Sequence, residues 1–231
     1  MSIKAHIPNT ITILNLVSGI LAVIAAFHGG RPYWGLTGYT WTFILIGVAA
    51  LFDFCDGAAA RLLHAYSKIG KELDSLSDLV SFGVAPSLLV FNVMCDATGR
   101  FTAYLALFIA AMGALRLARF NVDDRQTTSF IGLPIPASAI FWIGVAAWIQ
   151  RHGYPGDGPV LALVAVVSLL MVSPIPMFSL KFKNFDWREN FRRYVILAAA
   201  MLFLVTDGLP GLAWTITLYV VISLFGRRMA E

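Results

Sequence analysis

Residues 53–78 read DFCDGAAARLLHAYSKIGKELDSLSD, and they follow the apolar run YTWTFILIGVAALF of residues 39–52. The apolar run is suited to lipid, yet it leads directly into Asp53, Asp56 and Arg61. Charged side chains are costly inside a membrane unless something compensates them, so they usually mark a functional site there. We therefore expect this stretch to hold both a turn between two membrane helices and the chemistry of the protein.

The composition of the whole chain supports a membrane protein. Of 231 residues, 58% are hydrophobic and 13% are charged, which excludes an ordinary soluble domain. Segments near or above the length of a membrane helix cover residues 8–28, 39–63, 72–95, 100–120, 133–150, 158–175, 192–206 and 209–226. We predict an all-α integral membrane protein, a polytopic bundle of about eight transmembrane helices in contact with membrane lipids.

The distribution of basic residues predicts the orientation of this bundle. With the N-terminus in the cytoplasm, only Arg31, Arg100 and Arg151 of the 17 Lys and Arg residues lie outside. Both termini are then cytoplasmic, and the protein is a multi-pass protein of the cell (inner) membrane. Because the basic residues are scattered over short loops, the net charge of +4 does not indicate a nucleic-acid partner.

The acidic stretch has the spacing of one helix face followed by a second helix. The residues that share the first face, at i, i+3, i+4, i+7 and i+8, are Asp53, Asp56, Gly57, Ala60 and Arg61. Asp74 and Asp78 form an i, i+4 pair at the start of the next helix. Ser67 and Gly70 between them favour a turn, which predicts antiparallel neighbours with the active site facing the cytoplasm.

Four carboxylates brought together repel one another unless cations join them. No His or Cys stands at ligand spacing with these aspartates, so the cluster offers oxygen ligands only. We therefore expect Mg²⁺ or Mn²⁺, with Ca²⁺ also possible, and two such ions can assist a phosphoryl transfer. Gly57 and Ala60 leave room for a bulky ligand on this face, and Arg61 can pair with a phosphate oxygen.

The full pattern, D-x2-D-G-x2-A-R-x8-G-x3-D-x3-D from Asp53 to Asp78, resembles the signature of the CDP-alcohol phosphotransferase family. These membrane enzymes move a phosphatidyl or phosphoalcohol group from a CDP-linked donor to an alcohol. The resemblance implies that the four aspartates hold two metals against the donor, and that Asp78 is also the base for the acceptor hydroxyl. It further implies that Gly57, Ala60 and Gly70 line the nucleotide pocket, and that the protein is a homodimer.

Other stretches resemble the branch of this family that uses L-serine, which implies phosphatidyl transfer from CDP-diacylglycerol to L-serine. They are IPNTITILNLVSG (7–19), GKELDSLSDLVSFGVAPS (70–87), RLARFN (116–121) and FIGLPIPAS (130–138). The resemblance covers nearly the whole chain. We expect a single domain over residues 1–231, with a catalytic core at about 8–175 and additional helices at about 192–226.

The sequence allows more than one role for each residue that could select the acceptor. Arg116 or Arg119 can hold the carboxylate of serine, but either one equally suits the phosphate of glycerol 3-phosphate or serves as a positive-inside charge. Asn121 can bind serine or cap its helix. Thr12 and Asn15 on the first helix can contact the cytidine of CDP-diacylglycerol or bond between helices.

Two rival functions remain beside serine transfer. The same chemistry can use glycerol 3-phosphate or inositol as the acceptor. A function of another class is a cation-coupled transporter with the acidic cluster as its ion site, although no paired, broken helices support it.

Overall fold

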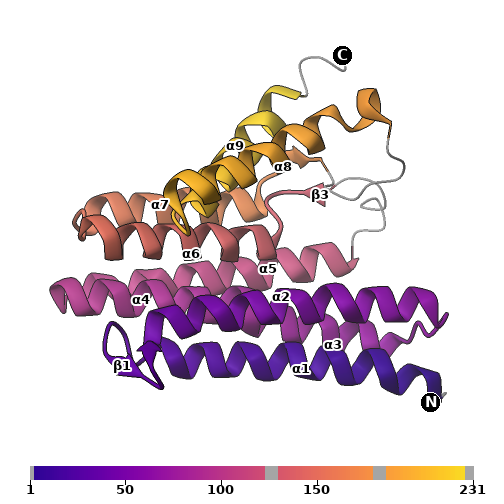
Figure 1. Cartoon of the computed structure of the whole chain (residues 1–231). Helices are drawn as coiled ribbons and strands as arrows, with labels where there is room; N and C mark the ends of the chain where they lie inside the picture. Colours follow the sequence, from indigo (N-terminus) through magenta and orange to yellow (C-terminus); the bar gives the residue numbers. More distant parts are fainter. Residues whose placement is uncertain (1–2, 123–129, 179–185, 227–231) are drawn as a thin grey trace. The chain divides into compact units, whose positions relative to one another are not determined.

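The structure is a computed structural model that describes residues 3–122, 130–178 and 186–226, and these residues are mostly helical (Figure 1). The elements in chain order are α1 (Ile3–Ala26), β1 (Pro32–Tyr33), β2 (Leu36–Thr37), α2 (Gly38–Leu62), α3 (Lys68–Asp78), the π-helical segment η1 (Leu79–Val84), α4 (Ala85–Thr98), the 3₁₀ segment η2 (Phe101–Leu107), α5 (Phe108–Val122), β3 (Phe130–Ile131), α6 (Ile135–His152), α7 (Asp157–Val172), β4 (Pro176–Met177), α8 (Trp187–Asp207) and α9 (Gly211–Gly226). The prediction of an all-α protein is confirmed.

Each of the eight predicted runs contains a helix, and four helical segments among the described residues are long and apolar enough to cross a membrane on their own. They are His6–Ala26, Gly38–Leu62, Lys68–Thr98 and Phe101–Val122. The apolar helices at Asp157–Val172 and Gly211–Phe225 are shorter. Large apolar side chains such as Val205 and Leu62 are exposed, as expected for surfaces that face lipid.

Helices α1, α3 and α8 begin four or five residues before their predicted apolar runs, and a side chain caps α3 and α8. α3 begins at Lys68 rather than near residue 72, since the Ser67 hydroxyl accepts a hydrogen bond from the backbone N–H of Gly70. α8 begins at Trp187 rather than near residue 192, with the Asp186 carboxylate accepting from the N–H of Arg188. Polar first turns extend helices beyond what hydropathy detects.

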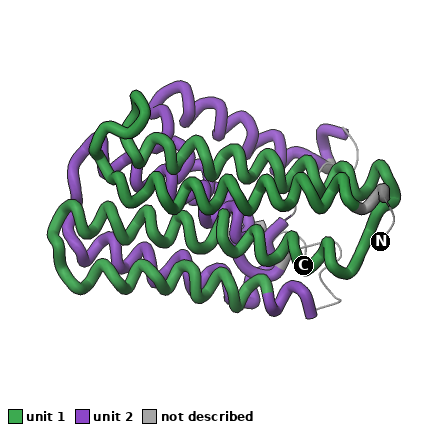
Figure 2. The backbone as a smooth tube through the Cα atoms, turned by 90° about the horizontal axis from the view of Figure 1, so that it is seen from below, with its two compact units in different colours: residues 1–117 green, residues 118–231 purple. Residues whose placement is uncertain are grey.

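The chain divides into two compact units, Met1–Leu117 and Ala118–Glu231 (Figure 2). In unit 1, α1 and α2 run side by side, and the short β1–β2 hairpin, in which Pro32 pairs with Thr37, connects them at one end. The small buried residues Ala22 and Ala49 favour close approach of the two helices. The hydroxyl of Thr42 on α2 also bonds the carbonyl of Ala22 on α1.

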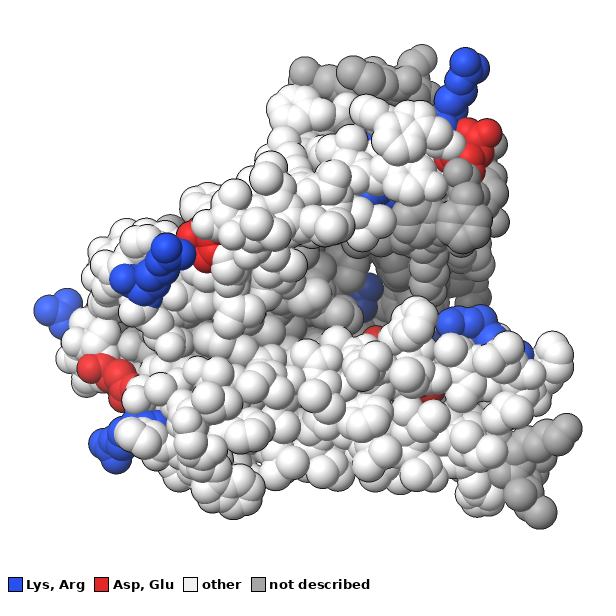
Figure 3. Space-filling view, in the orientation of Figure 1, with Lys and Arg blue, Asp and Glu red and all other residues white. Residues whose placement is uncertain are grey.

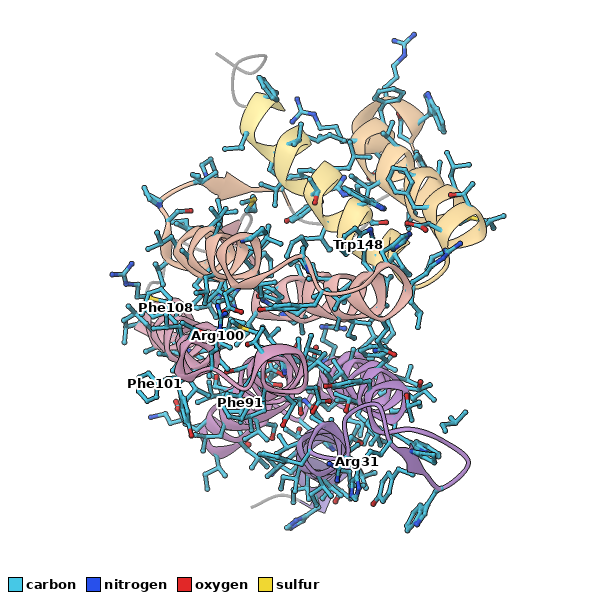
Figure 4. All side chains as sticks on the ribbon, turned by 90° about the vertical axis from the view of Figure 1, so that its left-hand side faces the viewer. Arg31, Phe91, Arg100, Phe101, Phe108 and Trp148 are labelled. Atoms are coloured by element: carbon cyan, nitrogen blue, oxygen red, sulfur yellow. The ribbon has the colours of Figure 1, made fainter. Side chains whose placement is uncertain are left out.

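One end of unit 1 is built from aromatic and structural polar contacts. Tyr39 donates a 2.6 Å hydrogen bond to Asp96 near the end of α4. Arg31 and Arg100, labelled in Figure 4, lie at this same end. The acidic residues of α2 come after the middle of that helix, toward its other end. Unit 1 therefore separates the two predicted outside arginines from the acidic stretch.

Asp74 and Asp78, the second acidic pair, belong to a long helical segment that is not α-helical throughout. α3, η1 and α4 form one continuous helical segment, and its π-helical part starts directly after Asp78. Short π segments inside α-helices occur frequently at functional sites. The predicted span is therefore correct in place, but its regular helical geometry is interrupted beside a candidate catalytic residue.

Unit 2 contains the four helices α6 to α9 and the β3–β4 pair, in which Phe130 pairs with Met177. Gly144 of α6 lies directly against Ala213 of α9, where an added Cβ would meet the Ala213 nitrogen. Arg151 of α6 forms a 3.0 Å ion pair with Asp207 of α8. The face of the molecule in Figure 3 is mostly uncharged over both units, as a membrane protein requires.

Candidate metal centre and active site

Three of the four signature aspartates converge in unit 1. Asp53, Asp56 and Asp74 each offer a carboxylate oxygen, and these three oxygens lie within 4.8 Å of one another. Octahedral Mg²⁺ holds oxygen ligands at about 2.0–2.1 Å, so opposite ligands stand about 4 Å apart. A small contraction would let all three oxygens contact one ion, and an all-oxygen donor set suits a hard divalent cation.

Helix geometry explains why these residues meet. Asp53 and Asp56 stand about one turn apart on α2, while Asp74 and Asp78 stand one turn apart on α3. The connection between the helices is tight, with His64 in the left-handed conformation at φ 50° and Ala65 donating to the carbonyl of Ala60. The two helices therefore turn back on each other with their acidic faces together.

Helix α1 supplies hydrogen bonds to two of the carboxylates. The Thr12 hydroxyl lies 2.6 Å from Oδ2 of Asp56, and the side-chain amide of Asn15 donates to Oδ1 of Asp78 at 3.3 Å. Thr12, Asn15 and Asp56 are all buried. Of the two alternatives for Thr12 and Asn15, the structure thus contains the bonds between helices, and these bonds reach the predicted metal ligands themselves.

The space beside Asp56 is kept open by Gly57. An added Cβ on Gly57 would meet only the guanidinium of Arg61, with Nη1 at 3.6 Å. Arg61 is exposed and folds back across the glycine, and Ala60 is partly exposed on the same helix. This part of α2 presents a small-residue surface next to a cation, which is suited to an incoming anionic ligand.

Gly70 differs from its predicted place in the turn, because it lies in the first turn of α3. An added Cβ would stand 2.9 Å from the Ser67 hydroxyl and 3.0 Å from Oδ1 of Asn9. Gly70 therefore lets Ser67 cap α3 and lets α1 approach. This structural role is compatible with the predicted contact between Gly70 and a nucleotide.

The predicted acceptor residues lie on α5 and differ in their environments. Arg116 is buried in unit 1. Arg119 is exposed in unit 2 and donates a 2.9 Å hydrogen bond to the backbone carbonyl of Val172. Asn121 is partly buried in the last described turn of α5. A buried arginine in a membrane helix favours a functional role over a simple topology charge, and this favours Arg116.

The FIGLPIPAS stretch builds a junction in unit 2 that the sequence did not predict. Gly132 has φ +76° and lies against the end of α7, where an added Cβ would meet the carbonyl of Met171. The N–H of Gly132 bonds the carbonyl of Ile175, and that of Leu133 bonds the carbonyl of Leu170. Alternation over two-residue strands is too short to be recognised in a sequence.

Two further residues beside the site were missed by the sequence analysis. Ser81 donates a 3.0 Å hydrogen bond to the backbone carbonyl of Asn15, and Gly19 lies directly against Ser81. Serine and glycine are common in membrane helices, so neither is informative alone. The signal that could have identified them is the spacing, since Thr12, Asn15 and Gly19 follow one face of α1.

Comparison with known proteins gives a consistent result. A model of the CDP-alcohol phosphatidyltransferase family matches residues 5–175. The chain is similar to a protein of Bacillus subtilis, with 37% identity over 172 residues covering 74% of this chain and 88% of that protein. It is similar to a protein of Methanocaldococcus jannaschii, with 33% identity covering 95% of this chain and 92% of that protein.

A third relative, from Saccharomyces cerevisiae, is 36% identical over 158 residues, which is 63% of this chain and 55% of that protein. All three relatives carry the name CDP-diacylglycerol–serine O-phosphatidyltransferase.

Proposed function

Because the chain belongs to the CDP-alcohol phosphatidyltransferase family, we propose that it transfers the phosphatidyl group of CDP-diacylglycerol to the hydroxyl of L-serine. The products are phosphatidylserine and CMP. The observation that carries this proposal is the convergence of Asp53, Asp56 and Asp74 in a chain whose relatives across bacteria, archaea and yeast are named for this reaction.

The acidic cluster is the place for the divalent metal on which the family depends. Asp53, Asp56 and Asp74 would hold Mg²⁺ or Mn²⁺, and Asp78 would complete a site for two ions, while Ca²⁺ also suits these ligands. Bound there, the ions would supply positive charge that stabilises the phosphate groups of the donor. Thr12 and Asn15 are neutral hydrogen-bond donors, so they orient the carboxylates but do not supply the positive charge that a metal ion would bring.

The reaction itself needs a base, an electrophile and a leaving group. Asp78 accepts the proton of the serine hydroxyl, and the serine oxygen forms a bond to the phosphorus that bears diacylglycerol. The bond from this phosphorus to the CMP oxygen breaks, and CMP leaves with the electron pair. Arg61, lying across Gly57, pairs with a phosphate oxygen and stabilises the charge that develops there.

The donor is bound along α2 and α1. Gly57 and Ala60 provide the surface on which the nucleotide lies, and Gly70 lines the same pocket from α3. Thr12 and Asn15 are near enough to Asp56 and Asp78 to contact a nucleotide held there.

The acceptor is bound from α5. Arg116 is the better candidate for holding the carboxylate of serine, because it is buried while Arg119 already bonds the end of α7. Asn121 in the following turn can bond the amino or carboxylate group of serine.

The domain organisation, the membrane orientation and the oligomeric state are inferred from the distribution of basic residues and from the family. Residues 8–175 form the catalytic core of one domain, and the helices at 192–226 are additional. The termini and the active site face the cytoplasm, from which L-serine arrives, and the enzyme acts in the cell membrane as a homodimer. The family match to residues 5–175 supports the catalytic core, and the separation of Arg31 and Arg100 from the acidic stretch supports the orientation.

The test is CMP release from CDP-diacylglycerol by the purified protein with Mg²⁺ or Mn²⁺, comparing L-serine, glycerol 3-phosphate and inositol. We expect release with L-serine and its loss in Asp78→Asn. Release only with another acceptor would keep the phosphotransfer chemistry and overturn the assignment of serine. No release with any acceptor would return the acidic cluster to the transporter hypothesis.

A further inference from the structure

Asn15 is a fully buried amide whose two ends have different environments. Its exposed fraction is 0%, its Nδ2 donates to Oδ1 of Asp78 at 3.3 Å, and its Oδ1 has no hydrogen-bond partner among the described residues. A carboxylate accepts hydrogen bonds, so the NH₂ end of the amide must face Asp78. Buried acceptors without a partner are rare and need an explanation. The bond to Asp78 is the gain that keeps this amide in place.

The backbone of α1 is held against the residues that follow Asp78. The carbonyl of Asn15 accepts a 3.0 Å hydrogen bond from Ser81. One turn along α1, a Cβ added to Gly19 would stand 2.8 Å from Cα of Ser81, so only glycine allows this approach. Asn15 therefore has little freedom to move relative to Asp78.

This contact occurs where the helix carrying Asp78 is irregular. Leu79–Val84 is π-helical and begins directly after Asp78. A π segment changes the direction in which neighbouring side chains project. The orientation of the Asp78 carboxylate is consequently not set by a regular helix alone, and the contacts from α1 supply an additional constraint.

We propose that Asn15 is a positioning residue for Asp78. Its amide fixes one carboxylate oxygen and thereby aims the other oxygen at the serine hydroxyl. This inference rests on the proposed function, and it gives Asn15 a role that differs from binding the nucleotide. A positioning residue affects the chemical step, whereas a nucleotide contact affects the binding of CDP-diacylglycerol.

The test is steady-state kinetics of Asn15→Leu, which has a similar size and no hydrogen-bonding groups. We expect kcat to fall about 10–100-fold, as for other partners that orient functional side chains, with the KM values of both substrates within about twofold. Ser18→Ala is the matched control, because Ser18 is also buried on α1 and its hydroxyl bonds the carbonyl of Leu14 within the same helix. It should retain the wild-type kcat.

The outcomes separate the possible roles. A raised KM for CDP-diacylglycerol with unchanged kcat would make Asn15 a nucleotide contact and overturn the proposal, as would wild-type kinetics. Thermal unfolding in detergent checks that each variant is folded, and Asn15→Ser replaces Asn15→Leu if the leucine variant does not fold. If the wild-type protein itself releases no CMP with serine, the proposed function fails; if only the Asn15 prediction fails, that function stands.

Discussion

Asp207 and Asp56 are both aspartates on apolar helices, but their surroundings differ. In unit 2, Asp207 accepts a 3.0 Å bond from the guanidinium of Arg151 and a 3.1 Å bond from the indole N–H of Trp214. In unit 1, Asp56 is buried, receives a neutral hydroxyl from Thr12, and lies within 4.8 Å of carboxylate oxygens of Asp53 and Asp74.

The difference shows that the groups around a carboxylate on an apolar helix indicate whether its role is structural or functional. A carboxylate that is paired with a cation inside its own unit is already compensated, and its role is structural. Carboxylates that gather around one another with neutral donors gain most from a cation that arrives with a ligand. The same residue type thus holds helices together in one unit and forms a candidate metal centre in the other.

The largest expected effect distinguishes these two kinds of aspartate directly. Asp74→Asn should lower kcat/KM more than about 100-fold, because it removes a ligand from a charge-stabilised transfer. Asp207→Asn should keep the activity within about twofold and lower only the stability, by about 0.2–1 kcal/mol for a partly exposed ion pair. Equal losses of activity in the two variants would show that Asp74 has no special role in the transfer.

The same contrast applies to the two arginines of α5. Arg116→Leu should raise the KM for L-serine about 10–100-fold while the KM for CDP-diacylglycerol changes little, because the carboxylate of serine would lose its buried guanidinium partner. Arg119→Leu should have a smaller effect, since Arg119 already bonds the carbonyl of Val172. Kinetics with serine as the varied substrate measure both, and the reverse order would transfer the serine role to Arg119.

A smaller effect tests whether neutral donors tune the carboxylates. Thr12→Val removes the hydroxyl from Asp56 and should weaken activation by Mg²⁺ about tenfold, as loss of an outer-shell partner does for metal ligands. Thr42→Val is the matched control, because Thr42 is also buried but bonds the backbone carbonyls of Ala22 and Gly38. The control should shift the unfolding temperature without changing the dependence on Mg²⁺.

Much of this arrangement could be predicted from the sequence, because it depends on local spacing. Asp53, Asp56, Asp74 and Asp78 follow helical periodicity, and each predicted apolar run contains a helix in the described part of the chain. The β3–β4 pair and the π segment after Asp78 could not be predicted, since two-residue strands and a single widened turn leave no periodic signal. The bonds from Thr12 and Asn15 depend on how α1 packs against α2 and α3, which spacing within one helix does not determine.

The effect of Mg²⁺ on the unfolding temperature should be the smallest of these changes. Mg²⁺ binds the folded protein and therefore raises its unfolding temperature, in proportion to the logarithm of the ion concentration once the site is occupied. We expect a rise of a few degrees for the wild type and for Asp207→Asn, and none for Asp56→Asn. A rise in Asp56→Asn equal to that of the wild type would place the stabilising ion elsewhere.

If the aspartates of α2 and α3 form the metal centre, their loss should abolish the binding of Mn²⁺, which electron paramagnetic resonance measures. Purified protein in detergent, with CDP-diacylglycerol present, is titrated with Mn²⁺, and the signal of the free ion is followed. Wild-type protein and Asp207→Asn should remove Mn²⁺ from solution, while the double variant Asp56→Asn/Asp74→Asn should not. Equal binding by all three proteins would show that these aspartates are not the ligands of the ion.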